Sequence, residues 1–153
     1  MSDVQADEPV FIPKQRIAEI QLERALKLFL YERDYVSAIT LAGAAEEIFG
    51  KLLILEGKGD RVSKDNWIDL CILAGGFDDT KAHRREFAGM LNWHRNELKH
   101  HDARPGEELV EEMLVGRSDA VDYLGRAVDN YLALTGNYSD DLIVRFHVDA
   151  DEG

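Results

Sequence analysis

Apolar residues recur at helical spacing along most of the chain, and three prolines mark where this pattern stops. Pro9 and Pro13 come before it and Pro105 interrupts it, because a proline ring is not tolerated inside a helix. Between the second and third prolines the spacing predicts four helices, roughly over residues 14–33, 35–55, 64–74 and 80–102.

A fifth helix is expected over residues 107–134, with a bend near Gly116, where Ser118 offers a new cap. The pattern as a whole predicts an all-α antiparallel bundle of about five helices over residues 14–136. A chain of 153 residues is long enough to form one domain that buries about two-thirds of its unfolded surface.

The segment 35–55 is expected to be the central helix of this bundle. Asp34 is a suitable N-cap, because its carboxylate can accept hydrogen bonds from the first turn, and Gly57 and Gly59 follow the end of the helix. Five small residues along it would let neighbouring helices approach closely: Ala38, Ala42, Gly43, Ala45 and Gly50. Ser63 is likewise expected to cap the short helix over 64–74.

Both ends of the chain are expected to lie outside the bundle. Residues 1–13 are predicted to form an extended acidic arm. Residues 137–153 are predicted to form a C-terminal tail, in which the apolar run 142–148 has the composition of a β-strand.

The composition excludes global disorder, since 45% of the residues are hydrophobic and 31% are charged. A formal net charge of −12 argues against a protein that coats nucleic acid or anionic membranes non-specifically. Cys71 is the single cysteine, which excludes an intramolecular disulfide and favours a reducing compartment. The acidic start of the chain and its short apolar runs lead us to expect a soluble, cytoplasmic protein with no membrane partner.

One segment departs from this acidic average. Residues 81–104 contain six Lys or Arg against three Asp or Glu, a local charge of +3, so that the rest of the chain carries −15. Four of the five histidines also fall in this segment: His83, His94, His100 and His101. A basic, histidine-rich helix on an acidic protein indicates a confined site for an anionic ligand, although a solvated helix face gives the same pattern.

At about 100° per residue, the helix over 80–102 separates into two faces. One stripe, which should face the core, consists of Phe87, Leu91, His94 and Leu98, flanked by Met90 and His101. A separate polar face consists of Arg95, Asn96, Lys99 and His100. This polar set suits a phosphodiester, because arginine braces non-bridging oxygens and histidine moves protons near neutral pH. His94 is interpreted as a histidine at the edge of the core rather than a catalytic group.

The sequence Arg95-Asn96-Glu97-Leu98-Lys99-His100 resembles the Arg-x4–6-His signature of the HEPN superfamily, in which a polar residue often follows the arginine. The expected helix count, the chain length and the helix break after the motif also match, so the resemblance covers roughly residues 15–135. It implies a HEPN-like helical bundle that acts as a homodimer, with the motifs of two protomers lining one cleft. Many HEPN domains are metal-independent endoribonucleases of toxin–antitoxin and other defence systems, while others bind ligands or act as scaffolds.

For the site, the resemblance implies that Arg95 stabilises the phosphorane and that His100 is the general acid/base for attack by the RNA 2′-OH. Asn96 would position the scissile phosphate, with Lys99 and His101 as further substrate-binding residues. His101 also gives a permitted Arg-x5-His spacing, so the motif histidine is His100 or His101, and the helical wheel favours His100.

Glu46 and Glu47 lie midway through the otherwise small and apolar second helix. One interpretation is that one carboxylate is exposed and the other has a partner. The sharper one is that Glu47 or Glu46 pairs with Arg95 and orients it, because a buried carboxylate requires a partner.

We expect neither a metal nor another cofactor. Glu97 and His100 form a single Glu-x-x-His pair, whereas a bundle-type di-iron site needs two such pairs and two further carboxylates, and the chain has no glycine-rich phosphate loop. The expected function is a metal-independent endoribonuclease that binds RNA, a toxin or defence effector with an antitoxin or other partner protein. The alternatives are a non-catalytic HEPN-like module that binds a nucleotide or a partner protein, and a helical interaction protein without a small-molecule site.

Overall fold

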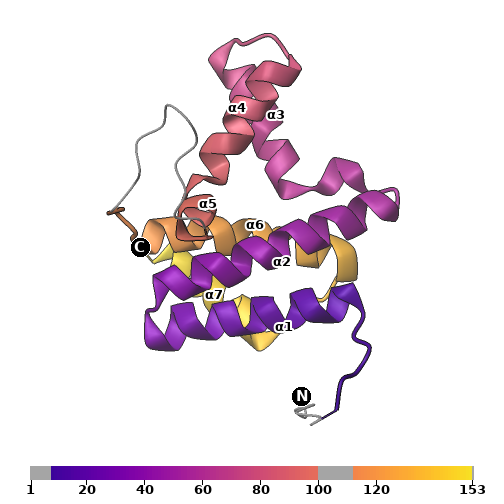
Figure 1. The fold of residues 1–153 in the computed structure, drawn as a ribbon, viewed down its shortest axis with the longest axis vertical. Helices are drawn as coiled ribbons and strands as arrows, with labels where there is room; N and C mark the ends of the chain where they lie inside the picture. Colours follow the sequence, from indigo (N-terminus) through magenta and orange to yellow (C-terminus); the bar gives the residue numbers. More distant parts are fainter. Residues whose placement is uncertain (1–7, 100–111, 153) are drawn as a thin grey trace.

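The computed structural model describes residues 8–99 and 112–152, and every regular element within these ranges is helical (Figure 1). In chain order the elements are α1 (Lys14–Lys27), the π-helical turn η1 (Leu28–Glu32), α2 (Tyr35–Leu55), the 3-10 turn η2 (Gly59–Arg61), α3 (Ser63–Gly75), α4 (Lys81–Leu91), α5 (Trp93–Lys99), α6 (Arg117–Thr135) and α7 (Asp141–Asp151). The predicted all-α class is confirmed. The described ranges contain seven α-helices rather than about five.

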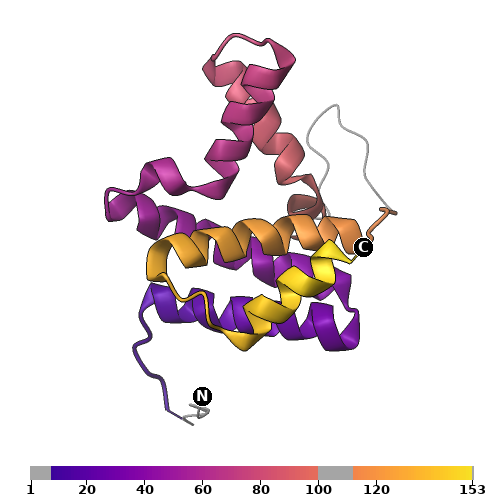
Figure 2. The ribbon, with the colours of Figure 1, turned by 180° about the vertical axis from the view of Figure 1, so that it is seen from behind.

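Helix α2 is the centre of the molecule, as its small residues predict. It packs against α1 on one side and α6 on the other (Figure 1), while α7 lies behind, against α1 and η1 (Figure 2). Ala38, Ala42 and Ala45 are completely buried, and Gly43 and Gly50 are buried as well. Because these residues have little or no side chain, the neighbouring helices can approach the α2 backbone closely.

One hydrophobic core fills the space between α1, α2, α6 and α7. Its largest completely buried side chains include Phe49, Leu26, Ile39, Leu124 and Val128. Burial of one such side chain contributes about 1.5–3 kcal/mol relative to its exposure, so this cluster supplies most of the stabilisation of the fold.

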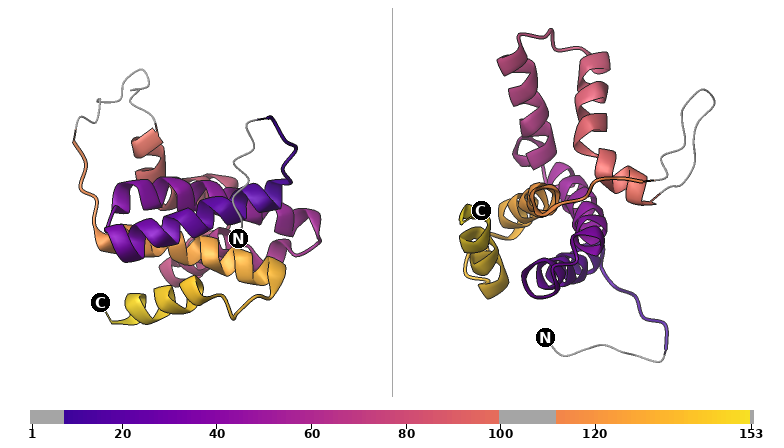
Figure 3. Two further views of the ribbon diagram at one scale, coloured as in Figure 1. Left: turned by 90° about the horizontal axis from the view of Figure 1, so that it is seen from below. Right: turned by 90° about the vertical axis from the view of Figure 1, so that its left-hand side faces the viewer.

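Helices α3 and α4 form a hairpin that projects away from the bundle (Figure 3). Helix α3 ends at Gly76, whose φ of 66° is in the left-handed region that favours glycine. Helix α4 then begins after Thr80, whose hydroxyl accepts a hydrogen bond from the His83 N–H at 3.2 Å. We call α3 and α4 the projecting hairpin.

The boundaries of the first two helices agree closely with the pattern. The segment 14–33 is helical to residue 32, its last turn is π-helical, and Arg33 ends it with a φ of 53°. Asp34 then caps α2 as predicted, because its Oδ1 accepts a hydrogen bond from the Ser37 N–H at 3.0 Å.

The cap of α3 differs from the prediction. The helix begins at Ser63 itself, and the N–H of Ser63 donates to Oδ1 of Asn130 on α6 at 2.8 Å. The Ser63 hydroxyl donates instead to Asp129 at 3.3 Å. The orphan N–H at this helix start is therefore satisfied by a residue 67 positions later, which local sequence spacing cannot reveal.

The prediction of a strand-like C-terminal tail is wrong. Residues 142–148 lie within helix α7, and the Asp140 carboxylate caps it by accepting hydrogen bonds from the N–H groups of Leu142 and Ile143 at 3.0 and 3.2 Å. Ile143 and Phe146, three residues apart, are both buried against the core. Packing of this helical face and the aspartate cap outweigh the β-propensity of the apolar run.

The other long predicted helices are divided. The segment 80–102 is split at Asn92 into α4 and α5, and its last residues lie outside the described ranges. Of the segment 107–134, residues 112–116 are not helical and α6 begins at Arg117. The N-cap is Gly116 rather than the expected Ser118, and Oδ2 of Asp119 accepts a hydrogen bond from the Gly116 N–H at 2.8 Å. Residues 8–13, the described part of the predicted arm, are irregular and exposed.

Candidate functional site

Two side chains of α6 stabilise the break between α4 and α5. In an unbroken α-helix the Arg95 N–H would donate to the Leu91 carbonyl. Here the Leu91 carbonyl accepts a hydrogen bond from Nη2 of Arg126 at 3.0 Å, and the Arg95 N–H donates to the hydroxyl of Tyr123 at 3.2 Å. The guanidinium of Arg126 also lies over the ring of Tyr123, 4.4 Å from its centroid. Two α6 side chains therefore replace one helix hydrogen bond and set the direction in which α5 leaves α4.

Arg95 lies against α2 rather than on an open polar face. Its side chain is only 19% exposed, and its stem covers Gly43, so that a Cβ at that position would lie 2.9 Å from Cγ of Arg95. Nη1 of Arg95 donates to the Gly43 carbonyl at 3.4 Å and lies 3.6 Å from Oε2 of Glu47. Because Gly43 has no side chain, the stem of Arg95 can lie directly against the α2 backbone. Asn96 and Lys99 are exposed, as predicted.

The apolar stripe of the segment 80–102 is less buried than predicted. Neither α4 nor α5 contains a buried residue, and Met90 is exposed. Leu98 packs against the main core from a partly buried position. His94 is also partly buried, and its Nε2 lies 3.2 Å from the Leu114 carbonyl and 3.4 Å from Oδ1 of Asp119, which fits a histidine at the edge of the core.

The two glutamates of α2 have separate partners. Glu47, which is half exposed, lies 3.6 Å from Arg95 and accepts a hydrogen bond from Lys51 at 2.8 Å. The Lys51 hydrogen bond, with the charges of Lys51, Arg95 and Lys64, lowers the pKa of the Glu47 carboxyl despite its partial burial. This carboxylate is therefore ionised at neutral pH and holds the Arg95 guanidinium in place.

Glu46 is the buried member of the pair, at 4% exposure, and it contacts Arg126 instead of Arg95. Nε of Arg126 donates to Oε1 of Glu46 at 3.0 Å, while Oε2 of Glu46 has no hydrogen-bond partner among the described residues. Asn130 adds a further link, since its Nδ2 donates to the Glu46 carbonyl at 3.1 Å. Arg126, Tyr123 and Asn130 were not among the predicted site residues. Their positions on the core side of α6, at helical spacing with buried apolar residues, were the available signal.

A pocket of about 260 Å³ lies beside Arg95, between α2, the start of α3 and α6. Three of its lining residues are cations: Lys51, Lys64 and Arg95. Three are acids: Glu46, Glu47 and Asp65. Glu47 already pairs with both Lys51 and Arg95, so Lys64 is the lining cation that forms no ion pair with a described residue.

The second half of the motif is not placed. His100 and His101 lie outside the described residues, as does the partner that Glu97 would need for its Glu-x-x-His pair. Within residues 8–99 and 112–152, no three His, Cys, Asp or Glu side chains converge in a way that could hold a metal ion. The structure therefore brings together Arg95 and Glu47 and leaves the position of the motif histidine open.

Comparison of the chain with models of known protein families, with curated proteins and with solved structures found no match. In the part of the chain that the structure describes, no helix is long and apolar enough to span a membrane.

Proposed function

We propose that this protein is a metal-independent endoribonuclease of HEPN type, centred on the segment Arg95–His100. The observation that supports it most is the fixed position of Arg95. Its guanidinium contacts the Gly43 carbonyl and the Glu47 carboxylate and lines a pocket that Lys64 also lines. Among the described residues both contacts use Nη1 alone, so that Nε and Nη2 can donate to a phosphate.

In the proposed reaction the RNA 2′-OH attacks the adjacent phosphorus, and the P–O5′ bond breaks. His100 removes the 2′-OH proton and a proton is delivered to the departing 5′ oxygen, giving a 2′,3′-cyclic phosphate and a 5′-OH. Arg95 stabilises the extra negative charge of the phosphorane, and the exposed Asn96 and Lys99 contact the RNA backbone. A homodimer would pair two such sites. A toxin or defence effector, with an antitoxin or other partner protein, is the corresponding biological role.

A non-catalytic module that binds a nucleotide or a partner protein is the second candidate. The observation in its favour is that Arg95 is mostly buried and already has a carboxylate partner in Glu47, on a chain with a net charge of −12. Such a guanidinium can fix a bound phosphate without any proton transfer.

The test is cleavage of total RNA by purified protein, with and without EDTA. Arg95→Ala and His100→Ala should each lower the rate by about 10²–10⁴-fold. Arg95→Lys, which keeps the charge and the stem over Gly43, separates loss of the guanidinium from loss of packing. Matched controls are Arg24→Ala on α1 and His147→Ala on α7, both exposed, which should leave the rate unchanged.

Two outcomes would contradict the proposal. If chelation abolishes cleavage and a divalent ion restores it, the metal-independent mechanism is wrong. If the folded wild type cleaves nothing, while Arg95→Ala weakens nucleotide or partner binding, the non-catalytic module replaces it. His101→Ala decides the register, since it should retain most of the activity when His100 is the motif histidine.

A further inference from the structure

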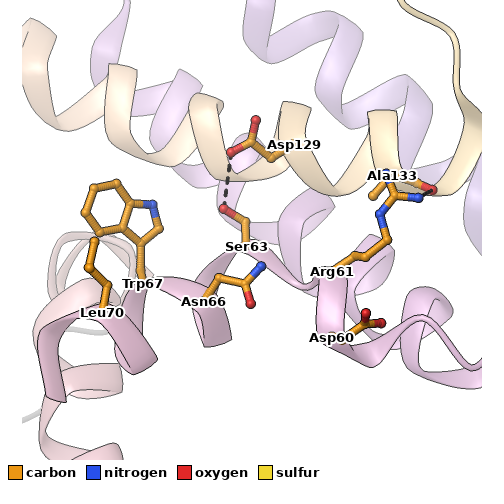
Figure 4. A pocket seen from close by; sticks show the side chains of 8 residues that line it. All are labelled: Asp60, Arg61, Ser63, Asn66, Trp67, Leu70, Asp129 and Ala133. Carbon is orange, nitrogen blue, oxygen red and sulfur yellow. Dashed lines mark hydrogen bonds between the residues drawn. The ribbon is translucent and has the colours of Figure 1, made fainter. Parts of the chain in front are cut away.

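A second hollow, of about 400 Å³, lies between the beginning of α3 and the C-terminal half of α6 (Figure 4). Neither Arg95 nor Glu47 lines it, so it is separate from the site described above. Its lining combines an apolar wall, Trp67 with Leu70, and polar groups from three elements: Asp60, Asn66 and Asp129.

Both side chains of this apolar wall are exposed to solvent. Trp67 is 50% exposed and Leu70 is 52% exposed, although both belong to a helix that contacts α6. Figure 4 shows the indole of Trp67 at one end of the hollow, with Leu70 beside it and Asn66 between the indole and Arg61. An exposed indole offers a flat, electron-rich surface on which a planar cation can stack.

Asp129 carries a negative charge, and none of the described cations forms an ion pair with it. Its carboxylate accepts one hydrogen bond, from the Ser63 hydroxyl at 3.3 Å. The surrounding protein removes part of its hydration and so raises the pKa of the Asp129 carboxyl, more than the Ser63 hydrogen bond and the charge of His147 on α7 lower it. A cation that entered the hollow would supply the missing favourable charge.

One cation, Arg61, already lines the hollow, but it does not occupy the end at which Trp67 lies. Its Nη1 donates to the Ala133 carbonyl at 3.3 Å, near the C-terminal end of α6. In Figure 4 it lies at the opposite end of the hollow from Trp67. Among the described residues that line the hollow, no cation other than Arg61 is present, so none lies between the indole and Asp129.

We infer that this hollow binds a guanidinium group, stacked on Trp67 and paired with Asp129. A guanidinium is favoured over a compact ammonium because it is planar and weakly hydrated, so that it can stack on the indole while its N–H groups donate to the carboxylate. The net charge of −12 draws such cations to the protein surface. The group belongs either to an arginine side chain of a protein partner or to a small guanidine compound.

The fluorescence of Trp67 tests this directly. The chain has two tryptophans, so Trp93→Phe leaves Trp67 as the single indole reporter. Agmatine and the peptide acetyl-Gly-Arg-Gly-amide should each change its emission saturably, whereas the same peptide with citrulline in place of arginine should not. Tighter binding of the peptide assigns the site to a protein partner, and tighter binding of agmatine assigns it to a small molecule.

Asp129→Asn should weaken binding of the tighter probe by at least about tenfold, because it removes a charge-assisted hydrogen bond. The control Asp65→Asn makes the same change on α3, at a residue that lines the pocket beside Arg95, and should leave the affinity unchanged. Thermal melts confirm that both variants are folded. The inference fails if neither guanidinium probe gives a saturable change, if the citrulline peptide binds equally well, or if Asp129→Asn has no effect in a folded protein.

Discussion

The bundle and the projecting hairpin differ in how they use their apolar residues. In the bundle, α1, α2 and α6 each bury several large or small apolar side chains in one core. In the projecting hairpin, Ile68 and Ile72 of α3 are buried, while Trp67, Leu70 and Leu73 of the same helix are exposed. The free energy of folding therefore comes mainly from the bundle, and the projecting hairpin keeps apolar surface available for contacts outside the chain.

Polar contacts from α6 fix how the two regions are joined. Arg126 and Tyr123 of α6 hold the ends of α4 and α5, and Asn130 of α6 holds the beginning of α3. Hydrogen bonds of this kind are directional, so they fix orientation more than they add stability. The bundle therefore supplies most of the free energy of folding, while Tyr123, Arg126 and Asn130 of α6 fix the position of the candidate site.

The largest expected effect is at the buried ion pair of the bundle. Glu46→Ala leaves the guanidinium of Arg126 buried without its carboxylate, and we expect a loss of about 3–5 kcal/mol in the free energy of unfolding. Urea unfolding followed by circular dichroism measures it. Glu47→Ala, next in sequence but half exposed, should cost at most about 1 kcal/mol. Equal losses in the two variants would show that burial does not separate these glutamates.

The next effect is at the junction between the two regions. Tyr123→Phe removes the hydroxyl that accepts the Arg95 N–H and keeps the buried ring, so we expect a cost of about 1 kcal/mol. Amide hydrogen exchange should become faster in α5 and stay unchanged in α1. Tyr138→Phe is the control, since Tyr138 is exposed beyond the end of α6. Unchanged exchange in α5 would mean that the hydroxyl does not hold the break.

A smaller effect separates the caps of the two regions. Asp34→Ala at the start of α2 should cost about 1 kcal/mol, and Thr80→Ala at the start of α4 should cost less, because the helix it caps has no buried residue. Urea midpoints of both variants measure the difference. A larger loss for Thr80→Ala would place more of the stability in the projecting hairpin than its burial indicates.

The Asp34 cap also has a pH dependence. Hydrogen bonds from Ser37, from its side chain first and then its backbone N–H, lower the pKa of the Asp34 carboxyl in the folded state. Its contribution is complete above the pKa of an unfolded aspartate, about 3.9, and is lost as the pH falls through the lowered folded value. The gap between wild type and Asp34→Ala should therefore be constant near neutral pH and close below about pH 4.

The helices of the bundle were predicted well from the sequence, because helix caps and the spacing of small and apolar residues are local features of the chain. The limits of α2 follow from the Asp34 cap and from the glycines after Leu55, and its central place follows from its small residues. The C-terminal tail was predicted incorrectly, because the apolar run whose composition favours a strand also places Ile143 and Phe146 on one helical face. The choice between the two depended on the core against which α7 packs.

The candidate site was predictable only in part. The sequence offered Glu46 and Glu47 as partners for Arg95, and Glu47 is the residue found there. The burial argument did not identify it, because the buried carboxylate is Glu46, which pairs with Arg126 instead. The split at Asn92 could not, because it depends on Arg126 and Tyr123, which lie about 30 residues later and act through space. Spacing along one helix carries no information about a side chain that enters from another.

The smallest expected effect is on the exposed face of the projecting hairpin. Leu73 is 80% exposed at the end of α3, so Leu73→Ala should change the free energy of unfolding by no more than about 0.5 kcal/mol. Leu124→Ala in the completely buried core of α6 removes the same atoms and should cost about 2–5 kcal/mol. Urea unfolding at low protein concentration measures both, so that association does not contribute to the stability. If Leu73→Ala costs as much as Leu124→Ala, the exposed face of α3 is buried in the folded protein in solution, and the distinction between a buried bundle and an open hairpin is wrong.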